Sequence, residues 1–108
     1  YDRVLADTGI TLPTVRPDAR HVYHLYAVQT QHRDALHRAL DAEGIQTGLH
    51  YPVPVHLQPA YADLGGQVGD HPCAEAAATA TLTLPIYPEL PAEVPARIAE
   101  IVRHTLPT

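Results

Sequence analysis

One short stretch of the chain, His50-Tyr51-Pro52-Val53-Pro54-Val55-His56, gathers side chains that can do chemistry. An imidazole donates or accepts a hydrogen bond near neutral pH, and the Tyr51 phenol does both, which suits a polyhydroxy or phosphorylated ligand. Two prolines in three residues preclude regular structure and stiffen the backbone, so less entropy is lost when a ligand binds. The residues alone leave two interpretations open, a preorganised binding loop or a merely structural turn.

The other histidines and the cysteine do not have the spacing of a metal site. His21 and His24 are three residues apart, so in a strand their side chains point to opposite faces. Cys73 has only His71 nearby and no second cysteine. We therefore predict no metal site, a buried Cys73 side chain, and a solvated or helix-capping carboxylate at Glu75.

The length and composition of the chain exclude several classes of protein. A length of 108 residues suits one domain. The net charge of −5 disfavours nucleic-acid binding, and no apolar run approaches the ~20 residues of a membrane span. A single cysteine excludes a disulfide framework and indicates a reducing compartment, the cytoplasm. Because the chain contains neither Lys nor Met, lysine chemistry cannot reside in it, and we expect it to be a piece of a longer protein.

The elements that must position the histidine-rich stretch are a strand, a helix and a second strand. Residues 21–30 are rich in Val, Tyr and Leu on both faces, which predicts a central strand covered on both sides. Residues 32–43 carry an apolar stripe and predict a helix that Gly44 ends. Residues 45–49 predict a short returning strand, with the loop 50–56 at its end.

The rest of the chain predicts short elements separated by proline and glycine. Residues 1–8 predict the end of a helix that Gly9 stops, and residues 58–64 and 72–80 predict short helices on either side of a glycine-rich turn. Residues 81–84 predict a strand that Pro85 ends. The chain closes with a predicted amphipathic helix, whose apolar stripe contains Val94, Ile98, Ile101 and Val102. Together they predict an α/β fold of the α+β type, with a short, mostly antiparallel sheet and helices packed on it.

An ordered set of motifs resembles one protein family. The motifs are Val22-Tyr-His-Leu-Tyr26, Arg33-Asp34 with Leu36 and Leu40, Gly44-Ile45, His50-Tyr-Pro-x-Pro-x-His56 with Gln58-Pro59-Ala60-Tyr61, Gly69-Asp70 with Pro72 and Glu75, and Leu82-Thr-Leu-Pro-Ile-Tyr-Pro88-x-Leu90. Across residues 1–106 the chain is similar to the C-terminal small domain of the DegT/DnrJ/EryC1/StrS family of sugar aminotransferases. Thr83 stands where the family often has Ser.

The resemblance implies a domain assignment and a role. Residues 1–108 would form the C-terminal small domain of a homodimeric, pyridoxal-phosphate-dependent enzyme of fold type I. Such an enzyme moves an amino group from glutamate or glutamine to a keto nucleotide-sugar, as in antibiotic biosynthesis. A lysine of the large N-terminal domain, absent from this chain, would hold the cofactor. His50 and Tyr51, then His56 and His24, would bind the substrate by positioning and hydrogen bonding.

The sequence leaves two alternatives to a sugar aminotransferase domain open. The chain could be a stand-alone module that binds a sugar nucleotide and has lost catalysis. It could also belong to a cofactor-dependent sugar dehydratase or an inosose aminotransferase of the same fold, because the residue that decides between these reactions lies in the large domain.

Overall fold

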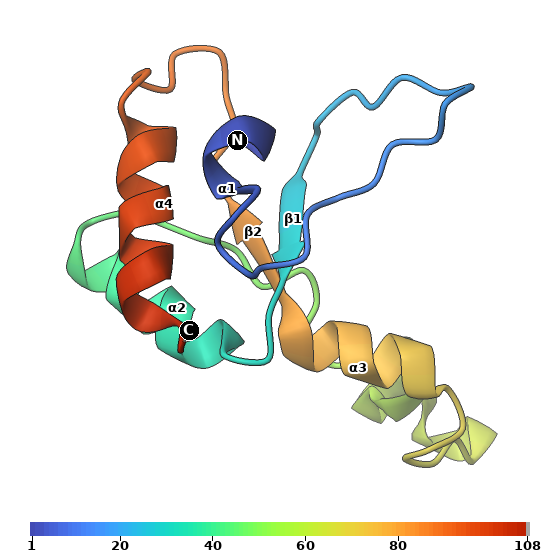
Figure 1. Cartoon of the computed structure of the whole chain (residues 1–108). Helices are drawn as coiled ribbons and strands as arrows, with labels where there is room; N and C mark the ends of the chain where they lie inside the picture. Colours follow the sequence, from blue (N-terminus) through green and yellow to red (C-terminus); the bar gives the residue numbers. More distant parts are fainter. Residues whose placement is uncertain (108) are drawn as a thin grey trace.

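The computed structural model describes residues 1–107 and contains four α-helices and a small antiparallel sheet (Figure 1). The elements are α1 (Asp2–Leu5), β1 (Tyr26–Gln29), α2 (Arg33–Ala42), the 3-10 turns η1 (Val55–Leu57) and η2 (Pro59–Leu64), α3 (Pro72–Ala80), β2 (Thr81–Leu84) and α4 (Val94–Thr105). The predicted fold class is confirmed. None of the helices in residues 1–107 has the length and apolar character needed to span a membrane.

The sheet consists of β1 and β2, extended by one residue on each side. The two strands are antiparallel, with Tyr26 opposite Leu84 and Val28 opposite Leu82. Thr11 bridges to Gln29 at the outer edge of β1, and Gly48 bridges to Thr83 at the outer edge of β2. The strand predicted over 45–49 is therefore mostly wrong: only Gly48 pairs, in a single bridge to Thr83.

The predicted strand over 21–30 is wrong in its first half, since pairing begins only at Tyr26. Pro85 has no N–H and ends β2 after Leu84, so the residues before Tyr26 have no strand to pair with. The chain bends instead, with Tyr23 at φ 51° and its N–H donating to His21 Nδ1 at 2.7 Å. The expected cover on both faces is also wrong, because Ala27 is half-buried and Gln29 is exposed on the face opposite Tyr26 and Val28.

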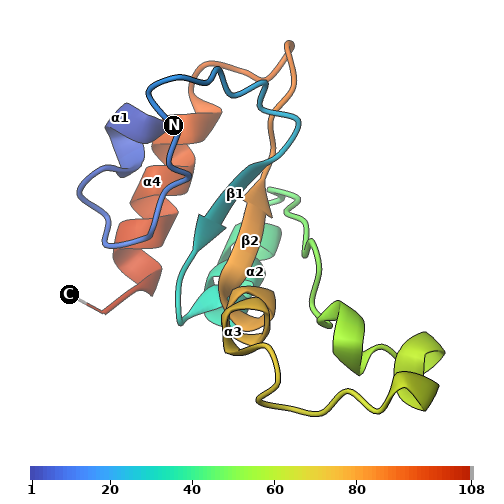
Figure 2. The ribbon, with the colours of Figure 1, turned by 90° about the vertical axis from the view of Figure 1, so that its right-hand side faces the viewer.

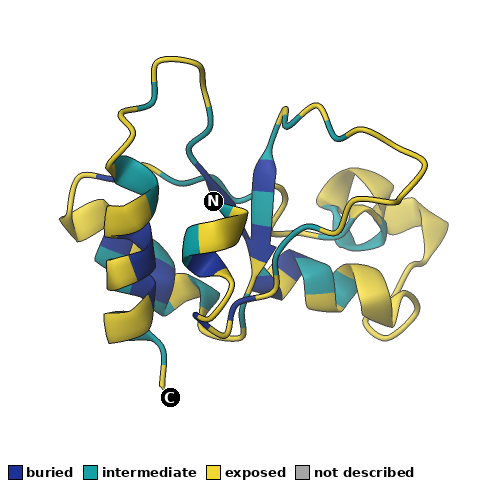
Figure 3. Cartoon of the chain, turned by 45° about the horizontal axis from the view of Figure 1, so that its top comes forward, coloured by how far each residue is buried: buried dark blue, intermediate teal, exposed yellow. Residues whose placement is uncertain are grey.

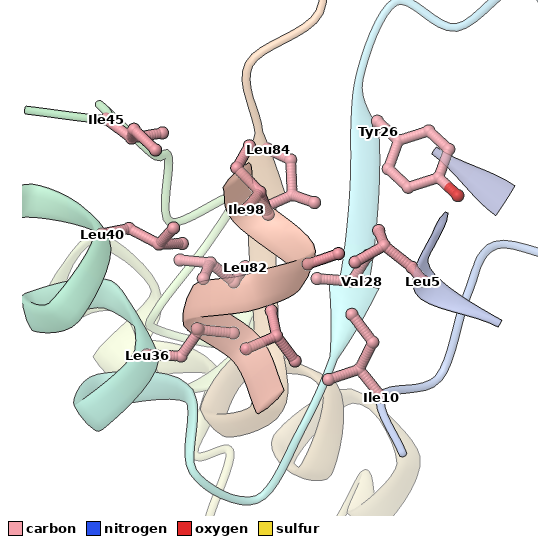
Figure 4. Packing of buried hydrophobic residues seen from close by; sticks show 12 residues of the cluster. Leu5, Ile10, Tyr26, Val28, Leu36, Leu40, Ile45, Leu82, Leu84 and Ile98 are labelled. Atoms are coloured by element: carbon pink, nitrogen blue, oxygen red, sulfur yellow. The ribbon is translucent and has the colours of Figure 1, made fainter. Parts of the chain in front are cut away.

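The hydrophobic core lies between the Tyr26–Val28 face of the sheet and the helices α2 and α4 (Figure 4). Alternate residues of the strands enter it, and the apolar stripes of α2 and α4 meet them. The buried cluster comprises Leu5, Ile10, Tyr26, Val28, Leu36, Leu40, Ile45, Leu82, Leu84, Ile98, Ala99 and Val102. The helical predictions for 32–43, 72–80 and the closing segment are therefore confirmed within one or two residues at each end.

The N-terminal helix is shorter than predicted. α1 ends at Leu5, whose carbonyl oxygen accepts hydrogen bonds from both the N–H and the hydroxyl of Thr8. Gly9 does take the left-handed conformation, at φ 77°, but in the turn that follows rather than as the helix stop. This turn directs Ile10 into the core and Thr11 to the edge of β1.

Residues 55–71, which we call the arm, lie outside this core. The arm contains η1 and η2 and lies away from α4 (Figure 2), on the side toward which α3 extends from the sheet (Figure 1). Neither η1 nor η2 contributes a side chain to the buried hydrophobic core, and most of the arm is exposed (Figure 3). Apolar burial therefore does little to hold the arm against the rest of the chain.

Candidate functional site

His50 begins the histidine-rich loop, residues 50–56, directly beyond the bridge between Gly48 and β2. Its Nδ1 lies 3.0 Å from the hydroxyl oxygen of Thr83. The imidazole lies so close to Gly48 that a Cβ at that position would be 2.4 Å from His50 Cε1. Gly48 is thus the residue that leaves room for the ring, and Thr83 is the residue that holds it.

Tyr51 follows His50 in the chain and, like it, is exposed. Its ring meets that of His50 edge to face, with 5.3 Å between centroids and 87° between planes. It is 73% exposed, and its hydroxyl makes no hydrogen bond within residues 1–107. A phenol held by its ring edge while its hydroxyl faces solvent can donate to and accept from a polar ligand. A shallow hollow of about 320 Å³ adjoins it, lined by Tyr51, Pro52, Val53, Gln58, Pro59 and Ala60.

His56, at the far end of the loop, faces a different element. Its Nε2–H donates to Glu75 Oε1 of α3 at 3.0 Å, with both side chains largely buried. The His71 ring packs edge to face against the His56 ring, with 4.7 Å between the ring centroids. The structure therefore groups His50 with Tyr51 and Thr83, and groups His56 with Glu75 and His71.

Glu75 is the centre of the second group. Its carboxylate also accepts the Gly69 N–H, at 2.9 Å to each oxygen, and the His71 N–H at 3.2 Å. Desolvation acts to raise the pKa of the Glu75 carboxyl, but the backbone donors Gly69 and His71 and the His56 imidazole outweigh it and lower that pKa. The helix-capping role predicted for Glu75 is confirmed, because the N–H of the cap residue His71 is one of its donors.

A larger hollow, of about 750 Å³, lies between the arm and the first turn of α3. It is lined by Val55, His56, Tyr61, Leu64, Gly65, Gly66, Asp70, His71 and Ala74. Gly66 packs on the backbone of η1 here, since a Cβ on Gly66 would lie 2.6 Å from the His56 carbonyl oxygen. The rim is apolar and open, with Leu64 78% exposed.

His24, the fourth predicted site residue, is not part of either group. It is exposed in the bent segment before β1, and no hydrogen bond or ring contact within residues 1–107 joins it to the other three. The predicted burial of Cys73 is wrong, because Cys73 is exposed in the first turn of α3, where a small side chain faces solvent. No three His, Cys, Asp or Glu side chains in the described part of the chain are grouped to hold a metal ion.

Sequence reasoning assigned no site role to Thr83, Gly48 or Gly66. Thr83 contacts His50 from 33 positions away, and Glu75 contacts His56 from 19. Neither separation follows a helical or strand period, so only the packing of β2 and α3 against the loop reveals these partners.

The residues present do not fit pyridoxal phosphate by themselves. The chain has no lysine to hold the cofactor as a Schiff base. The glycine-rich turn 65–69 resembles a phosphate loop, but the Gly69 N–H already donates to both carboxylate oxygens of Glu75, and that negative charge opposes a phosphate. The features of this chain are those of a small α+β domain that presents a stiff polar loop.

Comparison with known proteins identifies the family. The model of the DegT/DnrJ/EryC1/StrS aminotransferase family matches residues 1–103, and the chain belongs to that family. It is 49% identical over 94 residues to the erythromycin biosynthesis sensory transduction protein EryC1 of Saccharopolyspora erythraea, covering 86% of this chain and 26% of that protein. It is 48% identical over 96 residues to dTDP-3-amino-3,4,6-trideoxy-alpha-D-glucose transaminase of Streptomyces venezuelae, covering 89% of this chain and 25% of that protein.

Solved structures share this fold. The crystal structure of S. venezuelae DesV in complex with a ketimine intermediate superimposes with a TM-score of 0.89 at 46% identity, over 95% of this chain and 28% of that chain. A DegT/DnrJ/EryC1/StrS aminotransferase from Brucella abortus gives a TM-score of 0.81 at 29% identity, over 95% of this chain and 27% of that chain. The chain thus spans about a quarter of the length of the curated relatives it matches.

Proposed function

We propose that residues 1–108 are the C-terminal small domain of a homodimeric sugar aminotransferase, and that the loop 50–56 contacts its nucleotide-sugar substrate. Coverage of about a quarter of each curated relative, together with the absence of lysine, supports the domain assignment. In this proposal the large domain holds pyridoxal phosphate, which supplies an electron sink for amino transfer from glutamate or glutamine. The enzyme operates in the cytoplasm, consistent with one exposed, unpaired cysteine.

The names of the relatives support a sugar nucleotide as the amino acceptor. One relative is a transaminase of a dTDP-linked amino sugar, and another, at 40% identity, is UDP-N-acetyl-3-dehydro-alpha-D-glucosamine 3-aminotransferase of Acidithiobacillus ferrooxidans. Both substrates carry sugar hydroxyls and a diphosphate, which are groups that imidazole and phenol side chains recognise by hydrogen bonding.

The observation that carries the proposal is the fixed, exposed pair His50–Tyr51. Thr83 holds the His50 imidazole at 3.0 Å, and the Tyr51 ring rests against that imidazole with its hydroxyl free for a ligand. Because the pair is ordered before the ligand arrives, little further entropy is lost on binding. In our proposal these side chains orient the sugar nucleotide and do not attack it.

Substitution of the pair in the full-length enzyme tests the proposal. We expect His50→Ala and Tyr51→Phe each to raise the KM for the sugar nucleotide roughly five- to tenfold, the effect of one or two lost hydrogen bonds. The absorbance of the bound cofactor should stay unchanged. His104→Ala, on the exposed face of α4, is the matched control and should keep the wild-type KM.

Two results would contradict the proposal. A wild-type KM in both loop variants would remove the pair from the substrate site. A folded full-length protein that shows no cofactor absorbance would instead favour a stand-alone binding module.

A further inference from the structure

The two ends of the loop 50–56 are held by neighbouring parts of one continuous segment. His50 contacts Thr83 of β2, and His56 contacts Glu75 of α3. α3 ends at Ala80 and β2 begins at Thr81 with no residue between them. Both attachments of the loop are therefore fixed relative to the same backbone.

The attachment through Glu75 is polar and has little apolar support. η1 and η2 bury no side chain in the core, whereas the Glu75 carboxylate accepts from His56, Gly69 and His71. A carboxylate that receives several donors binds them more strongly than neutral pairs would. The hydrogen bonds of Glu75 are thus the principal side-chain tether between the arm and α3.

We propose that Glu75 is a positioning residue for the substrate loop: it holds His56 and the segment Gly69–His71 against α3, and thereby fixes the direction in which Tyr51 is presented. This inference rests on the proposed function of the loop. Pro52 and Pro54 carry the constraint from His56 back to Tyr51, because each removes backbone freedom between the two attachments. His56 accordingly serves as an anchor rather than as a ligand contact.

The test compares Glu75→Ala, Glu75→Gln and the control Glu100→Gln in the full-length enzyme. Glu100 is exposed on α4 and its carboxylate makes no contact with the loop. Amide hydrogen exchange is measured without substrate over residues 53–58 and 66–71. KM and kcat are measured in the reverse direction, with dTDP-3-amino-3,4,6-trideoxy-alpha-D-glucose as amino donor and 2-oxoglutarate as acceptor.

We expect Glu75→Ala to speed exchange in both segments and to raise KM about tenfold with little change in kcat, as for loss of hydrogen bonds to a charged group. Glu75→Gln keeps one acceptor oxygen, so its KM should lie between that of the wild-type enzyme and that of Glu75→Ala. The double variant His56→Ala/Glu75→Ala should have a KM no higher than Glu75→Ala alone, because Glu75 acts through His56.

The two measurements separate the inference from the function on which it rests. Unchanged exchange over 53–58 in Glu75→Ala overturns the positioning role, whatever the substrate is. Faster exchange with an unchanged KM overturns the link between the loop and the substrate.

Discussion

At the scale of single residues, two glycines matter as much as the histidines they adjoin. Gly48 leaves the space that the His50 ring fills, and Gly66 lets the arm approach the backbone of His56. Neither glycine has a positive φ, so the lack of a side chain, rather than backbone freedom, is what these positions require. The sequence shows the glycines but not their neighbours.

Gly48→Ala tests this packing in the full-length enzyme. The new methyl group would lie 2.4 Å from His50 Cε1, so the imidazole must leave Thr83, and we expect a rise in KM similar to that of His50→Ala. Thr83→Ser retains the hydroxyl and is the control that should keep a near-wild-type KM. Retention of the His50–Thr83 contact in a crystal structure of Gly48→Ala would contradict the prediction.

At the scale of secondary structure, the longer helices were predicted correctly and the length of β1 was not. The helices over 33–42 and 94–105 follow from their apolar stripes and the helix over 72–80 from its alanine content, with glycine or proline at their ends. The length of β1 depends instead on its partner, because Pro85 ends β2 and leaves residues 21–25 without a neighbour. A strand is stabilised by residues distant in sequence, and its extent therefore cannot be read from its own composition.

The difference in burial between β2 and the segment before β1 predicts a sharp difference in stability between two apolar substitutions. Leu82 is fully buried between β1 and the helices, whereas Val22 is 86% exposed in the bent segment that was predicted to be strand. We expect Leu82→Ala to lower the free energy of unfolding by about 2–5 kcal/mol. Val22→Ala should change it by less than about 0.5 kcal/mol. Denaturant unfolding of both variants measures this, and equal losses would contradict the assigned burial.

At the scale of the whole molecule, tyrosines connect the first residues to the end of the sheet. The Tyr1 hydroxyl donates to the Pro85 carbonyl oxygen at 2.7 Å, and the Tyr26 hydroxyl donates to Asp2. The centroids of the Tyr1 and Tyr26 rings lie 4.7 Å apart. Burial, and then the neighbouring Tyr87, raises the pKa of Tyr1 to about 12, and burial followed by the hydrogen bond to Asp2 raises the pKa of Tyr26 further.

These shifts predict how the isolated chain responds to alkali. A phenol whose pKa is raised by folding stabilises the fold fully below its unfolded pKa, about 10, and this stability is lost as pH rises through the folded pKa. We expect Tyr1 and Tyr26, among the six tyrosines, to ionise only near or above pH 12, together with loss of helical circular dichroism. Tyrosinate absorbance at 295 nm measures this. A chain that is folded at pH 7 but ionises all its tyrosines together near pH 10 would contradict it.

By itself, the sequence determined the family, the α+β class, most helices and the loop in which His50, Tyr51 and His56 lie. These features depend on local periodicity, on proline and glycine, and on an ordered set of motifs, all of which are written along the chain. Only the tertiary structure decided which way each histidine faces: His50 toward Thr83 and Tyr51, His56 toward Glu75, and His24 to neither. The physical reason is that these contacts join residues brought together by the packing of α3 and β2 beside the loop, and no sequence period encodes that packing.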